Sequence, residues 1–216
     1  MAIPTVAAKS GSPMREGAEA VARLFEKRGF LARLSDTDGG PPVVYAEDRN
    51  AGVDAPTVLL YNHYDVQPAE PVELWNSDPW ALTRDGDFLY GRGTSDDKGH
   101  ILCRLLALDA LKATLGELPV NVKVLIEGEE EVASTHLEGW MSKNSALLNA
   151  DVTLWEFGGV DETGRPELLL RPEGHRLLRA FCEIHCLRCT LRCGWFYLPQ
   201  CRLAPGLGAL HAEIAR

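Results

Sequence analysis

The stretch PTVLLYNHYDVQP, residues 56–68, decides how this chain folds. It begins with a run of apolar and β-branched residues, which is typical of a buried strand, and it ends in polar residues. His63 and Asp65 stand two positions apart where that strand meets a loop. Side chains at positions i and i+2 lie on one face of a strand, so Asp65 can accept the second ring N–H of His63. The stretch therefore predicts a core strand that delivers a histidine–carboxylate pair to one edge of a sheet.

Outward from this strand, helical and strand patterns alternate along the chain. Apolar residues at helical spacing precede Gly29 and Gly116, and glycine is common where helices end. Helices are predicted over residues 14–28, 97–116 and 135–150, and strands over 30–35, 41–47, 56–66, 118–131 and 151–159. Strands that alternate with helices predict an α/β fold, in which helices cover both faces of the sheet.

Polar residues follow several of the predicted strands, and in such sheets ligands bind beyond the carboxyl ends of the strands. The residues at these ends are His63, Asp65, Glu129, Glu130, Glu131 and Glu156, together with Asp96 and Asp97 at the start of a helix. Carboxylates that are packed together repel one another unless a cation neutralises them. Imidazole and carboxylate groups suit Zn²⁺, Mn²⁺ or Co²⁺. The sequence therefore predicts a metal site at this edge of the sheet.

Each motif also has a purely structural interpretation. A single His-x-Asp after a strand is often a polar turn, and EGEEE at residues 127–131 on its own is often a solvated charge run. The glycine-flanked loop YGRGTSDDKG, residues 90–99, on its own suits a flexible connection. The order of the three motifs and their shared position at strand ends favour the metal site.

Composition excludes several classes of partner. The 216 residues are 45% hydrophobic and 25% charged, which is ordinary for a globular protein. A net charge of −9 argues against nucleic acid and anionic membranes, because phosphate groups bind basic surfaces. No apolar run reaches the roughly 18 residues that a membrane span needs. Residues 1–17 lack the pattern of a signal peptide, so we expect a cytoplasmic protein.

Four motifs together resemble the M20 metallopeptidases, the co-catalytic zinc amidohydrolases that include carnosine-type dipeptidases, carboxypeptidase G and acetylornithine deacetylase. The motifs are YNHYDVQP (61–68), DPW…DGDFLYGRGTSDDKGH (78–100), LIEGEEEVAS (125–134) and ADVTLWEFGG (150–159). The similarity covers about residues 13–170. It implies an M20-type catalytic domain, a mixed sheet with helices on both faces.

The resemblance implies four metal ligands. His63 and Glu156 would bind one divalent ion, Glu131 would bind a second, and Asp96 would bridge the two. Some family members have aspartate where this chain has Glu156, and both residue types supply oxygen ligands. The ions would be zinc, with manganese or cobalt as alternatives.

The resemblance also implies a general base, Glu130, and an orienting partner of His63, Asp65. The register within the glutamate run follows the family pattern Glu-Gly-x-Glu-Glu, which starts at Glu127, and Ala133 replaces a glycine that is usual in the family. Two ions would lower the pKa of a bridging water. Glu130 would take its proton, and the resulting hydroxide would attack an amide carbonyl before Glu130 protonates the leaving amine. The implied substrates are dipeptides or N-acyl amino acids, and HYDVQP together with DPW favours the dipeptidase branch.

Residues 171–216 differ sharply from the preceding part. They contain seven arginines, no lysine, three glutamates and five cysteines, so the net charge changes from −13 over residues 1–170 to +4. Family members continue with a smaller lid domain, used for homodimerisation and substrate binding, and with a late histidine ligand. Neither is recognisable here. We therefore divide the chain into residues 1–170, the N-terminal part of a truncated M20 catalytic domain, and an aberrant tail over residues 171–216.

Three explanations of this tail compete. A zinc-binding appendage would use Cys182, His185, Cys186, Cys189, Cys193 and Cys201, but their spacing matches no standard zinc finger. A short extension packed on the sheet would need a helical or alternating pattern, which is not visible. A reading-frame shift near residue 171 explains both the excess of arginine and cysteine and the absence of lysine, and we favour it.

The sequence thus predicts a metal-dependent hydrolase of amide bonds in small substrates, impaired in this truncated chain. The alternative is a catalytically inactive remnant that acts as a metal-binding or interaction module.

Overall fold

The computed structural model describes residues 1–156, 159–160, 162–163, 165–171, 178–181 and 196–197. Its helices are α1 (Met14–Glu26), α2 (Lys98–Leu115) and α3 (Leu137–Lys143), with short 3₁₀ helices η1 (Val72–Leu74), η2 (Glu130–Val132) and η3 (Ser145–Leu148). Its strands are β1 (Leu31–Ser35), β2 (Val43–Asp48), β3 (Thr57–His63), β4 (Thr83–Asp85), β5 (Phe88–Tyr90), β6 (Asn121–Glu127), β7 (Val152–Leu154), β8 (Gly159–Val160), β9 (Pro166–Arg171), β10 (Leu178–Phe181) and β11 (Phe196–Tyr197).

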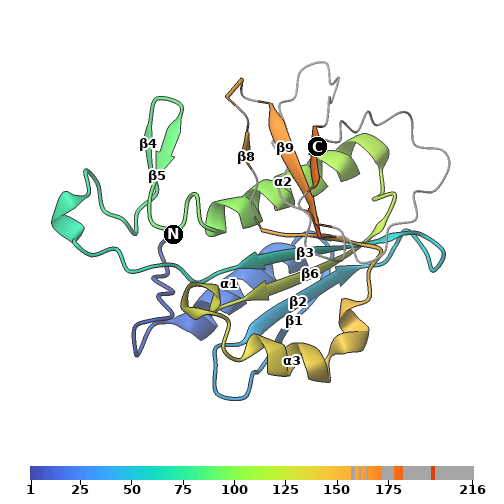
Figure 1. Cartoon of the computed structure of the whole chain (residues 1–216), viewed down its shortest axis with the longest axis horizontal. Helices are drawn as coiled ribbons and strands as arrows, with labels where there is room; N and C mark the ends of the chain where they lie inside the picture. The colour runs from blue at the N-terminus through green and yellow to red at the C-terminus, as the bar shows by residue number, and fades with distance from the viewer. Residues whose placement is uncertain (157–158, 161, 164, 172–177, 182–195, 198–216) are drawn as a thin grey trace.

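A mixed sheet forms the centre of the molecule (Figure 1). Its strands follow the order β1-β2-β6-β3-β7-β11-β9-β10, with β8 paired to β9. The three strands β6, β3 and β7 are parallel, whereas β1 and β2 join them in antiparallel pairs. Parallel neighbours require crossover connections, and α2 provides the one between β3 and β6. The predicted α/β fold with a mixed sheet is therefore confirmed.

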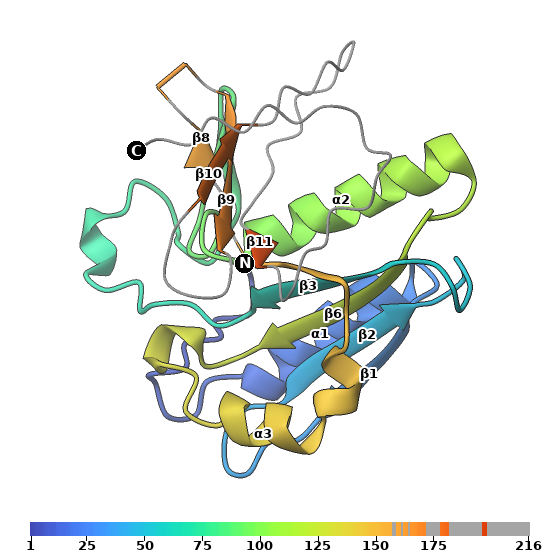
Figure 2. The ribbon, with the colours of Figure 1, turned by 45° about the vertical axis from the view of Figure 1, so that its right-hand side comes forward.

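Helices cover both faces of this sheet, as predicted. Successive side chains of a strand point to opposite faces, so neighbouring residues such as Val43 and Val44 enter different cores. One core joins the sheet to α1 and α2, and Leu105 of α2 is fully buried in it. The other joins the sheet to α3, where Trp140 packs against Tyr45 and Leu125. Figure 2 shows α2 and α3 on opposite sides of the strands.

Most predicted elements are present, but several bounds differ and some strands were not predicted. The strand predicted over residues 118–131 ends at Glu127, and Glu130 begins η2. The helix predicted over residues 135–150 is wrong in extent, because α3 ends at Lys143 and η3 follows. At the break, Asn144 leaves the helical conformation, and its side-chain amide donates to the carbonyl of Trp140 at 2.9 Å. Asparagine competes in this way with the helix backbone. The hairpin of β4 and β5 was not predicted, and Gly86, with φ +57, lies in its turn.

The tail falls mostly outside the described residues. The cysteines and the histidine of the zinc-binding appendage, one of the three explanations of the tail, lie outside the described residues, so the choice among the three stays open. The described parts of residues 171–216 are strands β10 and β11, which both pair with β9. The boundary at residue 170 also stays a prediction. Across the described ranges, no helix combines the length and the apolar character that crossing a membrane requires.

Candidate metal centre

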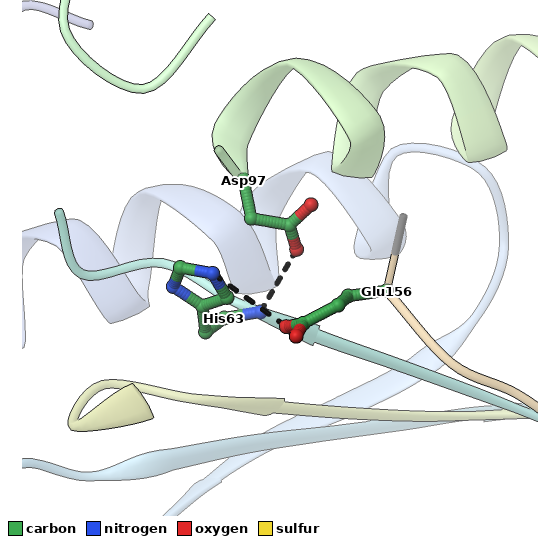
Figure 3. Close-up of side chains that lie close together, drawn as sticks. All are labelled: His63, Asp97 and Glu156. Atoms are coloured by element: carbon green, nitrogen blue, oxygen red, sulfur yellow. Dashed lines mark hydrogen bonds and ion pairs between the residues drawn. The ribbon is translucent and has the colours of Figure 1, made fainter. Parts of the chain in front are cut away.

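The carboxyl ends of β3, β6 and β7 meet at one edge of the sheet, because these strands are parallel. The N-terminus of α2 lies against the same edge (Figure 3). Six side chains come to this edge from four parts of the chain. They are His63 from β3, Glu130 and Glu131 from the turn after β6, Glu156 after β7, and Asp96 and Asp97 before α2. The convergence expected from the sequence is thus present.

The imidazole of His63 is fully buried between carboxylates. Its Nε2 atom lies 2.8 Å from Oδ1 of Asp96, 3.5 Å from Oε2 of Glu156 and 3.9 Å from Oε2 of Glu130. Its Nδ1 atom lies 3.2 Å from Oδ1 of Asp65 on the opposite side of the ring. One ring nitrogen therefore faces an orienting carboxylate, and the other faces a cluster of oxygen donors.

Asp65 links this histidine to the glutamate turn. Its buried carboxylate accepts backbone N–H groups from Glu130 at 3.2 Å and from Glu131 at 3.1 Å. Asp65 thereby fixes the ring of His63 and the turn that carries Glu130 relative to each other. The sequence indicated the first contact through the spacing of two, but nothing local to the sequence indicates the second.

The glutamate turn has unusual backbone geometry. A Cβ atom on Gly128 would lie 2.4 Å from Oη of Tyr64, so the position requires glycine. Ala133 and Ser134 have φ angles of +71 and +49, in the left-handed region that glycine tolerates best. The resemblance placed a glycine at position 133, and the conformation there explains why glycine suits it. Ser134 Oγ donates to Glu127 at 2.9 Å and closes the turn.

Glu156 is buried without full compensation. Its Oε2 atom has no hydrogen-bond partner among the described residues. Burial raises the pKa of Glu156 to about 8, although the positive charge of His63 opposes this shift. A buried carboxylate oxygen without a donor is costly unless a cation or a proton occupies the position it faces.

Two adjacent aspartates compete for the position beside His63. A ligand atom from each of His63, Asp97 and Glu156 lies within 4.8 Å of the others, and Figure 3 shows these side chains together. Both oxygens of Asp97 already accept hydrogen bonds: Oδ2 from Asn62 at 2.6 Å and from the N–H of His63 at 3.1 Å, and Oδ1 lies 2.9 Å from His100. Asp96 is about half-exposed and directs Oδ1 at Nε2 of His63. The hydrogen bonds leave Asp96 better placed to share a cation, whereas Asp97 anchors the end of β3.

The sequence did not single out Asp97 for this anchoring role. The only signal was an aspartate at the start of a helix, which predicts a favourable charge at the N-terminus and no particular partner.

Glu131 is placed differently from the other predicted ligands. Its Oε2 atom accepts a hydrogen bond from Gln67 at 2.8 Å, and its predicted contact with a second ion stays a prediction.

The carboxylates around His63 together have a larger effect on its pKa than burial has. Burial alone would favour a neutral ring, but the hydrogen bond that Asp65 accepts from the ring and the charges of Asp97, Asp65 and Glu156 outweigh burial and raise the pKa of His63 to about 10. Partial burial raises the pKa of Glu130, and His63 opposes that shift. The same excess of negative charge that retains a proton on the imidazole would attract a divalent cation in its place.

Comparison with known proteins is consistent with this geometry. Residues 59–187 match the family model described as Peptidase family M20/M25/M40. Human Beta-Ala-His dipeptidase is 44% identical over 124 residues, which are 56% of this chain and 22% of that protein. Cysteinylglycine-S-conjugate dipeptidase of Corynebacterium striatum is 40% identical over 128 residues, which are 58% of this chain and 28% of that protein.

A solved structure extends the similarity to the fold. The M20 family metallo-carboxypeptidase Sso-CP2 from Sulfolobus solfataricus superposes with a TM-score of 0.69 at 42% identity. The superposition covers 77% of this chain and 38% of that one. The chain therefore spans between about a fifth and two fifths of the length of the proteins it matches.

Proposed function

Because the chain belongs to peptidase family M20/M25/M40, we propose that it forms part of a metal-dependent hydrolase of amide bonds in dipeptides or N-acyl amino acids. Oε2 of Glu156 carries this proposal, since it is buried, faces Nε2 of His63 at 3.5 Å and has no hydrogen-bond partner among the described residues. A cation between the two residues would satisfy this oxygen and the ring nitrogen together.

The donor set suits two divalent ions. His63, Asp96 and Glu156 would hold the first, and Asp96 and Glu131 would contribute to the second. An imidazole nitrogen with carboxylate oxygens fits zinc, manganese or cobalt. Bound ions of this kind polarise a carbonyl group and lower the pKa of water.

Glu130 acts as the general base in this proposal. Its Oε2 atom lies 3.9 Å from Nε2 of His63 and its side chain is 36% exposed, so it reaches both the ligand cluster and solvent. The raised pKa of Glu130, caused by partial burial, brings its proton affinity closer to the neutral range in which a base works best. Glu130 takes the proton of the attacking water and returns it to the leaving amine.

Asp65 prepares the site for both residues. By accepting from Nδ1 of His63, it leaves Nε2 with the lone pair that binds a cation. By accepting the N–H groups of Glu130 and Glu131, it holds their side chains at the same edge. Orientation, proton transfer and ligation are thereby divided among separate carboxylates.

The names of two similar proteins support the choice of substrate, because both are dipeptidases. A cytoplasmic location and homodimerisation, which in the family uses the lid, belong to the same proposal. The net charge of −9 argues against association with nucleic acid and with anionic membranes.

A catalytically inactive, metal-binding remnant is the second candidate. The contact of Glu131 favours it, because the Oε2 atom of Glu131 accepts a hydrogen bond from Gln67 and does not face His63. We also propose that a shifted reading frame accounts for residues 171–216, a segment that the family match enters as far as residue 187. Sequencing the coding DNA across residues 165–216 tests the shift, since a single-base correction should restore Gly-Ile-Val followed by Asp-x-His-Ser-Gly.

Calorimetric titration with Co²⁺ or Zn²⁺, followed by a dipeptide hydrolysis assay, separates the two candidates. Two tight ions per chain with measurable hydrolysis support the enzyme, whereas one weak site without hydrolysis supports the remnant. In the enzyme, Glu130→Gln should lower the rate by about 10²- to 10⁴-fold and retain the ions. Glu138→Gln, on the exposed side of α3, is the matched control and should change neither quantity.

A further inference from the structure

Arg104 of α2 reaches across to the carboxyl ends of two strands. Its Nη1 atom donates to the backbone carbonyl of Tyr61 and to Oδ1 of Asn62, both at 2.7 Å, on β3. The same atom lies 3.2 Å from the carbonyl of Leu154 at the end of β7. Its Nη2 atom donates to the carbonyls of Trp155 and Glu156, the latter at 2.8 Å. One guanidinium therefore contacts five acceptors at the ends of two neighbouring strands.

Four of these acceptors are backbone carbonyls and one is the side chain of Asn62, and they lie beside two residues of the proposed metal centre, His63 and Glu156. Asn62 directly precedes His63, and the carbonyl of Glu156 belongs to the residue whose Oε2 faces Nε2 of His63. β7 has only three residues and pairs with β3 over Val152–Leu154, so its ladder stops before Trp155. Beyond that point, Arg104 supplies the hydrogen bonds from α2 that hold Trp155 and Glu156 against β3.

We infer that Arg104 is a positioning residue that sets the separation between His63 and Glu156 and thereby the geometry of the metal centre. This inference rests on the proposed function in taking these two residues as ligands of one ion. Arg104 would not touch the ion or the substrate. It acts through the backbone of the two strands.

The chemistry of the side chain supports this role. A guanidinium is planar and presents five N–H donors in a fixed fork, so one group can serve carbonyls on two strands at once. An ammonium cannot reproduce this fork, because it is a compact charge without a fixed direction. Burial lowers the pKa of Arg104 to about 10, opposed by Asp97 and Glu156, so the group stays charged at neutral pH.

A second contact ties Arg104 to the anchor of β3. The Oδ1 atom of Asn62 accepts a hydrogen bond from Arg104, and its Nδ2 atom donates one to Asp97 at 2.6 Å. Asp97 in turn accepts the N–H of His63. Asp97, which precedes α2, and Arg104, in its second turn, therefore both hold the end of β3, and Arg104 also holds the residues that follow β7.

The variant Arg104→Lys tests the inference, with Arg28→Lys as the matched control. Arg28, which follows α1, also makes a forked contact, to Asp109 of α2 at 2.9 Å, and among the described residues it has no acceptor at the strand ends. Two readouts are used on the full 216-residue chain. The first is the affinity for Co²⁺ together with the visible absorption spectrum of the Co²⁺-bound protein. The second is hydrogen–deuterium exchange of the metal-free protein, read in the peptides that cover residues 152–156.

We expect Arg104→Lys to weaken Co²⁺ binding by about 10- to 100-fold, as removal of supporting contacts around metal ligands does. Its Co²⁺ spectrum should shift, and exchange over residues 152–156 should accelerate. Arg28→Lys should alter none of these, even if it lowers the melting temperature. Unchanged affinity, spectrum and exchange in folded Arg104→Lys would overturn the inference.

Two further outcomes are also decisive. If the parent chain binds no Co²⁺, the proposed metal site fails, while the exchange measurement still decides whether Arg104 holds the end of β7. If Arg104→Lys does not fold, Arg104→Gln replaces it, since the amide keeps two donors without the charge. Failure of both variants to fold overturns a local positioning role, because Arg104 would then support the whole fold.

Discussion

The carboxylate of Asp65 lies 3.2 Å from Nδ1 of His63, and both side chains are fully buried. The same carboxylate accepts the backbone N–H groups of Glu130 and Glu131. Asp65 is therefore the point at which the histidine strand and the glutamate turn are joined. Four predictions follow the contacts outward from this residue.

Asp65→Asn should weaken zinc binding by about 10- to 100-fold, because the amide is a poorer acceptor for the ring and one of its two ends carries donors. Calorimetric titration of the variant measures the change. Asp36→Asn is the control, since Asp36 forms an exposed ion pair with Arg15. Equal affinities in the Asp65 variant and the parent chain would show that this carboxylate does not orient the ring.

The same substitution should affect stability at Asp97 and metal binding at Asp96. Asp97→Asn should lower the free energy of unfolding by about 1–3 kcal/mol. The amide N–H₂ group would replace a carboxylate oxygen that now accepts hydrogen bonds, so a donor would face another donor. Asp96→Asn should leave this free energy nearly unchanged, because the side chain is 53% exposed, yet abolish tight metal binding. Urea denaturation and metal titration of both variants check the pair. The assignment is reversed if Asp97→Asn is the variant that loses the metal.

Glu156→Gln should separate metal binding from stability. Without metal and above about pH 8, where the carboxyl group is ionised, the substitution removes a buried charge with an unpaired oxygen that the charges of Glu130, Asp97 and Asp96 destabilise. The metal-free variant should therefore be more stable than the parent by about 1 kcal/mol. It should also bind zinc more weakly. Thermal denaturation above pH 8, with and without zinc, gives both quantities, and loss of stability in the metal-free variant would contradict the proposed cost of burying this carboxylate.

Gly128→Ala should displace the glutamate turn, because the added Cβ would lie 2.4 Å from the ring of Tyr64. Overpacking of this kind lowers the free energy of unfolding by about 1–3 kcal/mol. Gly139→Ala is the matched control: within the described residues, no heavy atom outside its own helix lies within 4 Å of its new Cβ. In the middle of α3, that change should stabilise the chain by about 0.5–1 kcal/mol. Chemical denaturation of both variants decides the prediction, which fails if the two alanines have the same effect.

Much of the fold could be predicted because its signals are local. The apolar run before His63 and the polar residues after it define β3, and the apolar stripe before Gly116 defines α2. The extent of α3 could not be predicted in this way, because its end depends on how Asn144 satisfies the carbonyl of Trp140. The β4–β5 hairpin was missed because its strands have only three residues each.

The sequence by itself determined which residues meet at the sheet edge, since polar residues follow β3, β6 and β7, and these three strands are parallel, so their carboxyl ends share that edge. It also determined the excess of carboxylates there, which is a matter of composition. Only the tertiary structure decided how those carboxylates divide their tasks. Asp96 and Asp97 are neighbours of the same residue type, and what separates them is which donors the fold places around each. Arg104 has no local signal at all, because four of its five acceptors are backbone carbonyls, which every residue possesses and only the folded arrangement brings within reach.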